Sequence, residues 1–512
     1  MKKNILNISI YLAIIFFIIL PVVYTIFSMF FGDSSFTENI KQLDKNTFLL
    51  LAKSILLAFT VASFTIFFGA ILAFMLYKIK TRFSNFFKLV LLIPLFISPY
   101  ILAVAYKDFF YLLLGNCNLI SSFFGVILVL TFVYTPLSIL IIGSALSNIN
   151  SQIEESGFII TSFNKVMYKI ILPLVKPALI SSFILVFIFS LSEFSVPAFF
   201  GVKVFTTEIF TQFSAFYNHS LAILQSLFLI IICVSLLFAD RKYLSKASFL
   251  SIGNKGTKSK FYKLKNPIIS NLFLTTWLIL SVVLPFIVLF IQAFLGGDTN
   301  FFKALELLLP TFASSFFLAF IGAIIIVFVG FVVANYSVKY KKTDWVLLIV
   351  FAIPSTIYGI SLIKFYNQPM LNFIYSGYAI IIIAYVGKFS FISTKIIENA
   401  LKQIPKSLDE AAQIASISNS SRIRKILIPL ILPALFASFI ISFIFSIGEL
   451  GTTIMLYPPG TEIMPIKVYT IMANAPQSLT SSMTLIVFSV SLLMISGFYL
   501  ISKLAFKKYV DN

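Results

Sequence analysis

The sequence predicts an all-α polytopic membrane protein, with twelve transmembrane helices arranged as two six-helix repeats. Three observations lead to this fold class. Of the 512 residues, 60% are hydrophobic and 11% are charged, which is more apolar surface than a soluble fold can bury. Apolar stretches of about 20 residues, enough to cross a bilayer, recur along the chain. The second half also repeats residues of the first at nearly constant spacing.

The first apolar stretch, within residues 1–31, follows Lys2 and Lys3. It is too long for the apolar region of a signal peptide and no A-x-A site follows it, so we expect a retained first span. Each span must be helical, because unpaired backbone groups cannot face hydrocarbon. The other expected spans are 48–77, 86–106, 124–147, 174–196, 221–238, 268–294, 309–336, 345–365, 377–397, 431–450 and 481–504.

The two halves form an internal repeat of small and polar residues. Small residues four apart favour close packing of membrane helices, and here they recur in register. We therefore expect two fused six-span units, 1–239 and 267–512, related by a parallel repeat. The pairs 261 residues apart are Ser54 and Ser315, Ala58 and Ala319, Gly69 and Gly330, and Ala73 and Ala334, and the pairs 256 residues apart include Ser190 and Ser446, and Glu193 and Glu449.

The formal net charge of +20 reports topology. The linker 240–266 carries eight Lys or Arg residues against one acid, Asp240, and further basic groups lie on alternate loops. The positive-inside rule assigns these loops, the linker and both termini to the cytoplasm. The same distribution argues against a nucleic-acid partner.

Residues 408–429 form a polar interruption between two expected spans. Glu410, Ala411 and Ala412 are good helix formers, and Ser407 can cap the helix that they begin. The small polar run 416–421 favours a turn, and Pro429 is expected to begin the next apolar segment. A weaker copy occupies 153–173. The pattern predicts a short helix presented outside the bilayer in each repeat.

The 408–429 stretch resembles the EAA loop of bacterial ABC-importer permeases. That pattern is Glu-Ala-Ala, three residues, Gly, nine residues and I-x-L-P. The residues here match except for Ser416 in place of the Gly and Ile428 in place of the Leu. The resemblance implies coupling loops at 150–173 and 405–429 that contact a cytoplasmic ATPase, through residues of the motif that include Pro173 and Pro429.

The first coupling loop is one residue shorter, so its register is open between two alignments. Counted from upstream residues, Glu155 takes the Glu position, Ser156 and Gly157 replace the alanines and Thr161 replaces the Gly. Counted back from Pro173, Glu154 takes the Glu position. We expect this loop to be the looser copy and the second loop to tolerate mutation least.

A narrower resemblance covers nearly the whole chain. Residues 93–106, 189–213 and 445–460 resemble fused iron(III)-type permeases, and thiamine, putrescine and phosphonate permeases share much of the pattern. The resemblance implies the membrane subunit of an importer in a bacterial inner membrane, with ferric iron as the first cargo and thiamine, polyamine or phosphonate as alternatives. The implied partners are two copies of an ABC ATPase, which bind ATP and Mg²⁺, a periplasmic substrate-binding protein and the lipid bilayer.

Three ionisable residues lie within or beside apolar spans. Such groups are costly at membrane depth unless they face protein or water. Glu193 and Glu449, near the outer ends of the fifth and eleventh spans, either face the translocation pathway or cap and pair structurally. Lys388, near the middle of the tenth span, either pairs internally or contacts substrate.

The sequence indicates no catalytic, metal or cofactor site of its own. Gly253–Ser259 lacks the spacing of a phosphate-binding loop, and two cysteines with one histidine exclude a Cys or His metal cluster. ATP hydrolysis is therefore assigned to a separate subunit. The rival interpretations are an ion-coupled secondary transporter, for which few intramembrane relay residues are present, and a membrane scaffold, which leaves the paired loops without a role.

Overall fold

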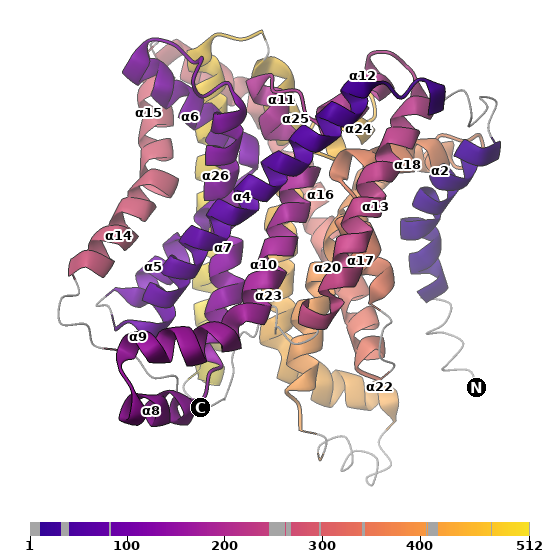
Figure 1. The fold of residues 1–512 in the computed structure, drawn as a ribbon. Coiled ribbons are helices and arrows are strands. Elements are labelled where there is room, and N and C mark those ends of the chain that lie inside the picture. Colours follow the sequence, from indigo (N-terminus) through magenta and orange to yellow (C-terminus); the bar gives the residue numbers. More distant parts are fainter. Residues whose placement is uncertain are drawn as a thin grey trace.

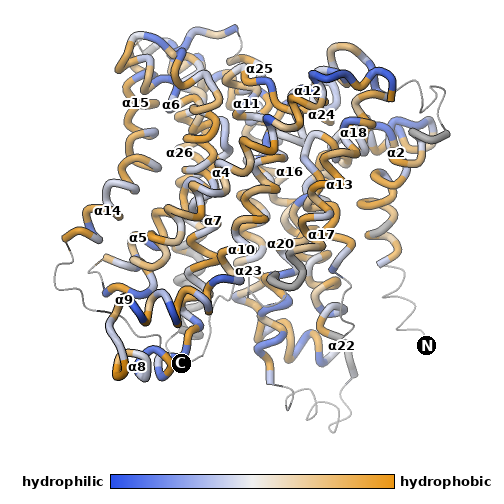
Figure 2. The backbone as a smooth tube through the Cα atoms, viewed as in Figure 1, coloured by the Kyte–Doolittle hydropathy of each residue, from blue (hydrophilic) through white to orange (hydrophobic). Residues whose placement is uncertain are grey.

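A computed structural model of the chain describes residues 11–31, 40–80, 83–244, 262, 268–295, 298–339, 344–405, 407, 418–472 and 474–510. Within these residues the protein is a helical bundle without β-strands. The helices α8, α9 and α22 lie at one end, which we name the α8 end, and α11, α12 and α24 lie at the other (Figure 1). Hydrophilic residues gather toward these two ends (Figure 2). The predicted all-α fold class is confirmed.

The first half contains a run of helices and π- or 3-10-helical turns. They are η1 (Ile15–Ile19), α2 (Leu20–Phe31), α4 (Lys45–Lys78), α5 (Ser84–Val90), η2 (Ile93–Phe96), α6 (Pro99–Leu114), α7 (Phe123–Ser147), α8 (Ser151–Ile160), α9 (Phe163–Val166), η3 (Met167–Ile171), α10 (Leu172–Ser192), α11 (Ser195–Phe200), α12 (Phe205–Ser214) and α13 (His219–Leu244).

The second half follows a similar order. Its elements are α14 (Ile268–Leu278), η4 (Ile279–Val283), α15 (Leu284–Leu295), α16 (Asp298–Lys339), α17 (Trp345–Ala352), α18 (Ser355–Tyr366), α19 (Asn372–Tyr375), α20 (Ala379–Lys402), α22 (Asn419–Arg422), η5 (Ile423–Leu427), α23 (Ile428–Ile447), α24 (Thr453–Leu456), α25 (Met464–Met472) and α26 (Gln477–Val510).

Two of the expected spans are broken. Among the described residues, ten helices are long and apolar enough to cross a membrane, and two bent pairs bring the number to twelve. The expected spans 86–106 and 345–365 are these pairs, bent by 96° at Ser98 and by 107° at Ile353. Both residues are extended and precede a proline, whose ring disfavours helical geometry in the residue before it. The expected ranges gave no indication of these bends.

Four π-helical turns each end two residues before a proline. The turns η1, η3, η4 and η5 precede Pro21, Pro173, Pro285 and Pro429. A proline inside a helix removes one N–H donor and crowds the carbonyl four residues earlier, so the hydrogen-bond ladder shifts locally. At Pro429 the helix continues from Asn419 through η5 into α23, so the expectation that this proline begins the segment was wrong.

The residues that defined the repeat make equivalent contacts in both halves. Gly69 of α4 lies against Ser138 of α7, and Gly330 of α16 lies against Ser393 of α20. The serine hydroxyls then bond onward, Ser138 to Ser182 and Ser393 to Ser438, each at 2.7 Å. Glycine is needed at both crossings because a Cβ would overlap the facing serine. The predicted pair of repeats is thereby confirmed in its packing.

The first helix of each half packs on the other half. The helix α2 lies on α18, and α15 lies on α6. The hydroxyl of Tyr366 donates to the Phe17 carbonyl at 3.1 Å, and that of Tyr106 donates to the Leu280 carbonyl at 2.7 Å. Both acceptors lie in the proline-induced turns η1 and η4, so each tyrosine supplies a donor where the helix has lost one.

We expect Gly69→Ala to lower the free energy of unfolding by about 1–3 kcal/mol, the usual cost of overpacking. The new Cβ would lie 2.5 Å from the Ser138 Cβ and force α4 away from α7. The measurement is a denaturant titration of the purified protein in detergent. Gly497→Ala in α26 is the matched control, because its new Cβ meets nothing within 4 Å. Equal stability changes in the two variants would contradict the close crossing.

Candidate functional site

A cavity of about 250 Å³ lies between the two repeats, at the points where the broken spans bend. The first half contributes residues from the η2–α6 bend, α7 and α10, and the second half contributes residues from α17, α18, α20 and α23. Most of the lining is apolar. The polar groups include Ser98, Tyr134, Ser192, Glu193, Ser195, Ser355, Lys395 and Glu449.

Glu193 lies at the end of α10, half-buried on one side of this cavity. Its Oε1 accepts the backbone N–H of Ser195 at 2.8 Å, and its Oε2 accepts the hydroxyl of Tyr134 at 3.1 Å. The carboxylate therefore satisfies a donor at the start of α11 while it faces the cavity. The predicted position near the outer end of the fifth span is consistent with this placement.

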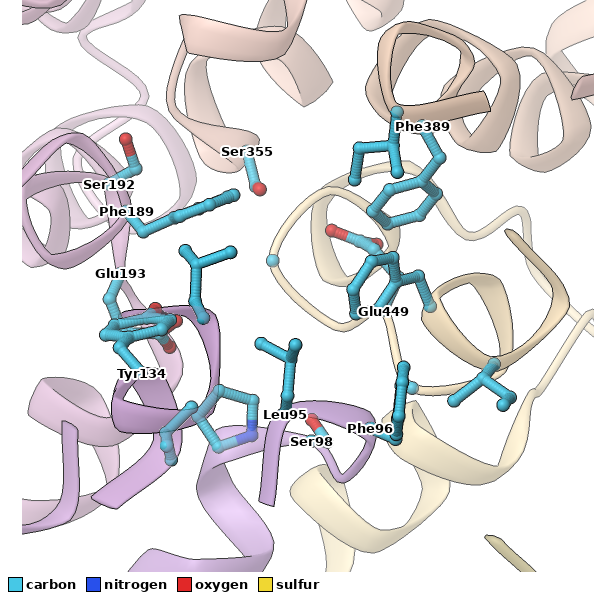
Figure 3. Close-up of a pocket in the computed structure, with 18 of the residues that line it drawn as sticks. Leu95, Phe96, Ser98, Tyr134, Phe189, Ser192, Glu193, Ser355, Phe389 and Glu449 are labelled. Atoms are coloured by element: carbon cyan, nitrogen blue, oxygen red, sulfur yellow. Dashed lines mark hydrogen bonds between the residues drawn. The ribbon is translucent and has the colours of Figure 1, made fainter. Parts of the chain in front are cut away.

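Glu449 follows α23 and lies on the opposite side of the cavity (Figure 3). Its two oxygens accept the backbone N–H groups of Thr452 at 2.7 Å and Thr453 at 3.1 Å. The side chain is buried, with 8% of its surface exposed. Both carboxylates thus bind backbone donors next to a short helix. Of the two alternatives set out from the sequence, the structure shows the capping contacts, and a role of the two acids in a translocation pathway stays a prediction.

Lys388 has a backbone partner. Its Nζ donates to the carbonyl of Ile353 at 2.7 Å, which the break between α17 and α18 leaves without a helical donor. The cavity lining includes Lys395 but not Lys388. Lys395 in turn forms ion pairs with Asp344 at 2.6 Å and Glu398 at 3.0 Å, so its charge is balanced locally. Lys388 also interacts electrostatically with Glu449, so the charge of this glutamate is partly balanced from behind the lining. The two glutamates place carboxylate oxygens on opposite sides of the cavity.

The cavity does not form a metal-binding cluster. No three His, Cys, Asp or Glu side chains gather around a common point in the parts of the chain that the structure describes. Cys117 and Cys233 are both free thiols. A cation passing between Glu193 and Glu449 would meet two carboxylates and several hydroxyl oxygens.

The first predicted coupling loop contains a well-defined helix, α8, capped by the Asn150 side chain. Glu154 is fully buried and forms an ion pair with Lys78, whereas Glu155 is exposed. Gly157 is buried, and a Cβ there would lie 2.6 Å from Ile170. Thr161 is the C-cap of the helix.

The outer face of α8 exposes Glu155, Ser156 and two isoleucines, Ile159 at 86% and Ile160 at 84%. Isoleucines with so much exposed surface, on a helix at the end of a membrane bundle, indicate a contact surface for another protein. The glutamate that points toward such a partner is Glu155, while Glu154 points into the chain. The structure thus distinguishes a buried Glu154 from an exposed Glu155, while the alignment of the loop and its contact with an ATPase stay predictions.

The second predicted coupling loop is mostly outside the described residues. Glu410, Ala411, Ala412 and Ser416 all belong to that segment. Pro429 is described and exposed, and it lies within the continuous helix that ends in α23. Pro173 occupies the corresponding place at the start of α10.

Sequence reasoning missed three buried charged or polar contacts. Lys78 pairs with Glu154 and Tyr262 also bonds that carboxylate. Asp108 of α6 accepts the side chains of Gln477 and Ser481 from α26 and thereby joins the two halves. The sequence did contain one indication that Lys78 has a structural role. Lys339 follows Lys78 by 261 residues, the same offset that separates Gly330 from Gly69.

Comparison with known proteins finds relatives along most of the chain. The "Putative ferric transport system permease protein FbpB 1" of Haemophilus influenzae is 24% identical over 499 residues, covering 89% of this chain and 78% of the relative. The "Ferric transport system permease protein FbpB" of Actinobacillus pleuropneumoniae is also 24% identical, covering 89% and 72%. The "Putative 2-aminoethylphosphonate transport system permease protein PhnV" of Salmonella typhi is 24% identical over 33% of this chain and 64% of its own length.

The family model for the "Binding-protein-dependent transport system inner membrane component" matches twice, at residues 65–244 and 326–507. One match falls in each repeat, and the two together cover more than half of the chain. They include the helices that line the cavity and the segments of both predicted coupling loops. This chain therefore belongs to the family of binding-protein-dependent transport system inner membrane components.

Proposed function

We propose that this chain is the membrane subunit of an ATP-driven importer that carries ferric iron across a bacterial inner membrane. The observation that carries the proposal is the cavity between the repeats, with Glu193 and Glu449 on opposite sides. Support for the cargo comes from relatives named as ferric transport permeases, which align with 89% or 90% of the chain.

The chemistry of the cavity favours a cation. Two carboxylates in a mostly apolar enclosure offer oxygen donors to a cation, and water screens their charges poorly. Lys388 interacts electrostatically with Glu449 and offsets part of its charge. Fe³⁺ is a hard cation that prefers oxygen donors, and two carboxylates with nearby hydroxyls bind it without trapping it, as transport requires. Relatives named for 2-aminoethylphosphonate and sulfate cover only 33% and 27% of the chain, and the same acids repel such anionic groups. Thiamine and polyamines are positively charged and remain the alternatives.

The orientation follows from charge. Under the positive-inside rule, the α8 end and both termini face the cytoplasm. The exposed isoleucines of α8 then meet a cytoplasmic ATPase, and one ATPase copy docks on each coupling loop. ATP and Mg²⁺ belong to those subunits. The end that holds α11, α12 and α24 receives the periplasmic binding protein. The basic residues at the α8 end include Lys165, Lys169, Arg422, Arg424 and Lys425.

Transport follows from relative movement of the two repeats. Closure of the ATPase dimer draws the coupling loops together and rocks the halves about the cavity. The bent spans place Ser98 and Ser355 beside the cavity, so the same movement opens it toward one side and closes it toward the other. The residues of this chain form the pathway and the coupling loops that move the repeats, and ATP hydrolysis by the ATPase provides the free energy.

Replacing both cavity acids by amides should slow iron transport by about tenfold or more, since about 1.4 kcal/mol of lost attraction is a factor of ten. In the Glu193→Gln, Glu449→Gln double variant, each amide oxygen can still accept one backbone N–H group. At position 449 one of the two N–H groups, of Thr452 and Thr453, loses its acceptor, so the amount of folded protein is measured beside uptake. The measurement is ATP-dependent iron uptake by proteoliposomes that hold the complete complex. Glu462→Gln is the control, because that acid is exposed and pairs with Lys467. Unchanged uptake in the double variant would contradict a pathway between the two acids.

Charge reversal at the coupling loops should release the ATPase. In Glu155→Lys and Glu410→Lys variants we expect the amount of co-purified ATPase to fall by about tenfold, because a reversed charge in an interface is repelled. The Glu410 variant should show the larger loss. Membrane insertion should be normal in both. Glu306→Lys serves as control, since Glu306 is exposed near the first turns of α16. A full complement of ATPase together with undiminished transport would refute the assignment.

A further inference from the structure

The linker between the two halves contacts the first coupling loop through Tyr262. The hydroxyl of Tyr262 donates to Glu154 Oε2 at 2.6 Å, and the other carboxylate oxygen binds Lys78 Nζ. Lys78 and Glu154 have no exposed side-chain surface. One carboxylate on α8 is therefore shared between the last residue of α4 and a residue of the linker.

The backbone of Tyr262 is fixed as well. Its N–H donates to the Lys78 carbonyl at 2.6 Å, and its carbonyl accepts the Lys80 N–H at 3.1 Å. Together these bonds make an isolated parallel bridge between Ile79 and Tyr262. The linker residue thus lies alongside the extended chain that leaves α4, and it caps groups that the end of the helix would otherwise expose.

The ring of Tyr262 packs against aromatic side chains from three elements. Its centroid lies 5.4 Å from that of Phe158 in α8, 5.5 Å from that of Phe163 in α9 and 6.4 Å from that of Phe74 in α4. The pairs with Phe158 and Phe163 are edge-to-face and the pair with Phe74 is stacked, and aromatic pairs at these distances stabilise a fixed arrangement. We name the set Phe74, Lys78, Glu154, Phe158, Phe163 and Tyr262 the linker clasp.

The hydroxyl keeps its proton. Burial, and then the hydrogen bond and the charge of Glu154, raise the pKa of Tyr262 above its ordinary value. The tyrosine therefore stays a donor to the carboxylate throughout the physiological pH range. A phenylalanine in its place would preserve the ring contacts and leave one oxygen of Glu154 without this partner.

We propose that Tyr262 is a positioning residue for transport, which fastens the first coupling helix α8 to the span α4 so that movement of α8 is transmitted into the membrane. Without the linker clasp, α8 is connected to the bundle mainly by the short turns on either side of it. Movement of α8 by the ATPase would then bend these turns and would not displace α4. This inference rests on the proposed function only in assigning that movement to an ATPase.

The clasp also connects the two repeats. Tyr262 precedes Ile268, the first residue of α14, by six positions, and α14 contacts α4 and α5 of the first half. The residue that binds Glu154 of α8 is therefore close in sequence to the first helix of the second half, which itself contacts α4. The clasp also compensates for Ser156 and Gly157, which make α8 intrinsically weaker than a Glu-Ala-Ala helix. The first coupling loop is thus stabilised by contacts outside α8, with Lys78 of α4 and with Tyr262 of the linker.

The test compares Tyr262→Phe with the unaltered full-length complex. The variant should retain the normal amount of ATPase and normal ATP hydrolysis. The cargo transported per ATP hydrolysed should fall by about tenfold, the effect of losing one hydrogen bond to a charged group. Tyr168→Phe is the matched control, because Tyr168 lies near the same loop and is 73% exposed. It should leave the ratio unchanged.

A second measurement follows the clasp directly and needs no transport. Spin labels are attached at Ile160→Cys in α8 and Lys80→Cys after α4, both exposed positions, in a chain carrying Cys117→Ser and Cys233→Ala. The distance distribution between the labels should be narrow with Tyr262, remain narrow in Tyr168→Phe and broaden in Tyr262→Phe.

Unchanged coupling or an unchanged distance distribution in Tyr262→Phe would overturn the proposal. Loss of the ATPase from that variant would also overturn it, because Tyr262 would then be needed for assembly. A complex that moves no iron at all but shows the expected change in label distances would leave the clasp standing and reject the proposed function instead.

Discussion

Backbone groups inside a membrane must find partners within the protein, and this constraint explains most of the structure. Prolines determine where backbone groups lose their helical partners, because they interrupt the hydrogen bonds of the helix. They produce π-helical turns before Pro21, Pro173, Pro285 and Pro429, and they break two spans at Ser98 and Ile353. The freed groups are then bound by side chains. Tyr106 and Tyr366 donate to carbonyls in the π-helical turns, and Lys388 donates to the carbonyl at one break.

The candidate site is a product of the same constraint. The two breaks bend their spans by 96° and 107°, and the cavity opens between the bends. Glu193 and Glu449 accept backbone N–H groups beside the short helices that follow, so each acid has a structural role before it meets any cargo. Such bonds hold the carboxylates in fixed positions facing the cavity. Because the backbone hydrogen bonds already hold each carboxylate at the cavity, the structural role and the proposed transport role are compatible in the same residue.

Much of the fold was predictable from the sequence, because a repeat is visible when its residues recur in register. Ser54 and Ser315 show this well. Each hydroxyl accepts a backbone N–H from a helix far along the chain, Phe205 in one half and Met464 in the other. The bends were not predictable, since hydropathy averages over a span and carries no information on direction. The linker clasp was hidden for another reason. Lys78, Glu154 and Tyr262 are far apart in sequence, and a tyrosine in a basic linker has no distinguishing pattern. The register of Glu154 and Glu155 required knowing which side chain is buried.

Passage of ferric iron through the cavity between the two family domains, at the expense of ATP, is the transport event that we propose. It is tested most directly by uptake into proteoliposomes containing the chain, its ATPase and its binding protein, with ferric iron, thiamine, putrescine and 2-aminoethylphosphonate offered separately. We expect iron to accumulate only when ATP is supplied, and the other compounds not to accumulate. Accumulation of a different compound would refute the cargo, and uptake that persists without the ATPase but collapses with an ion gradient would refute the mechanism.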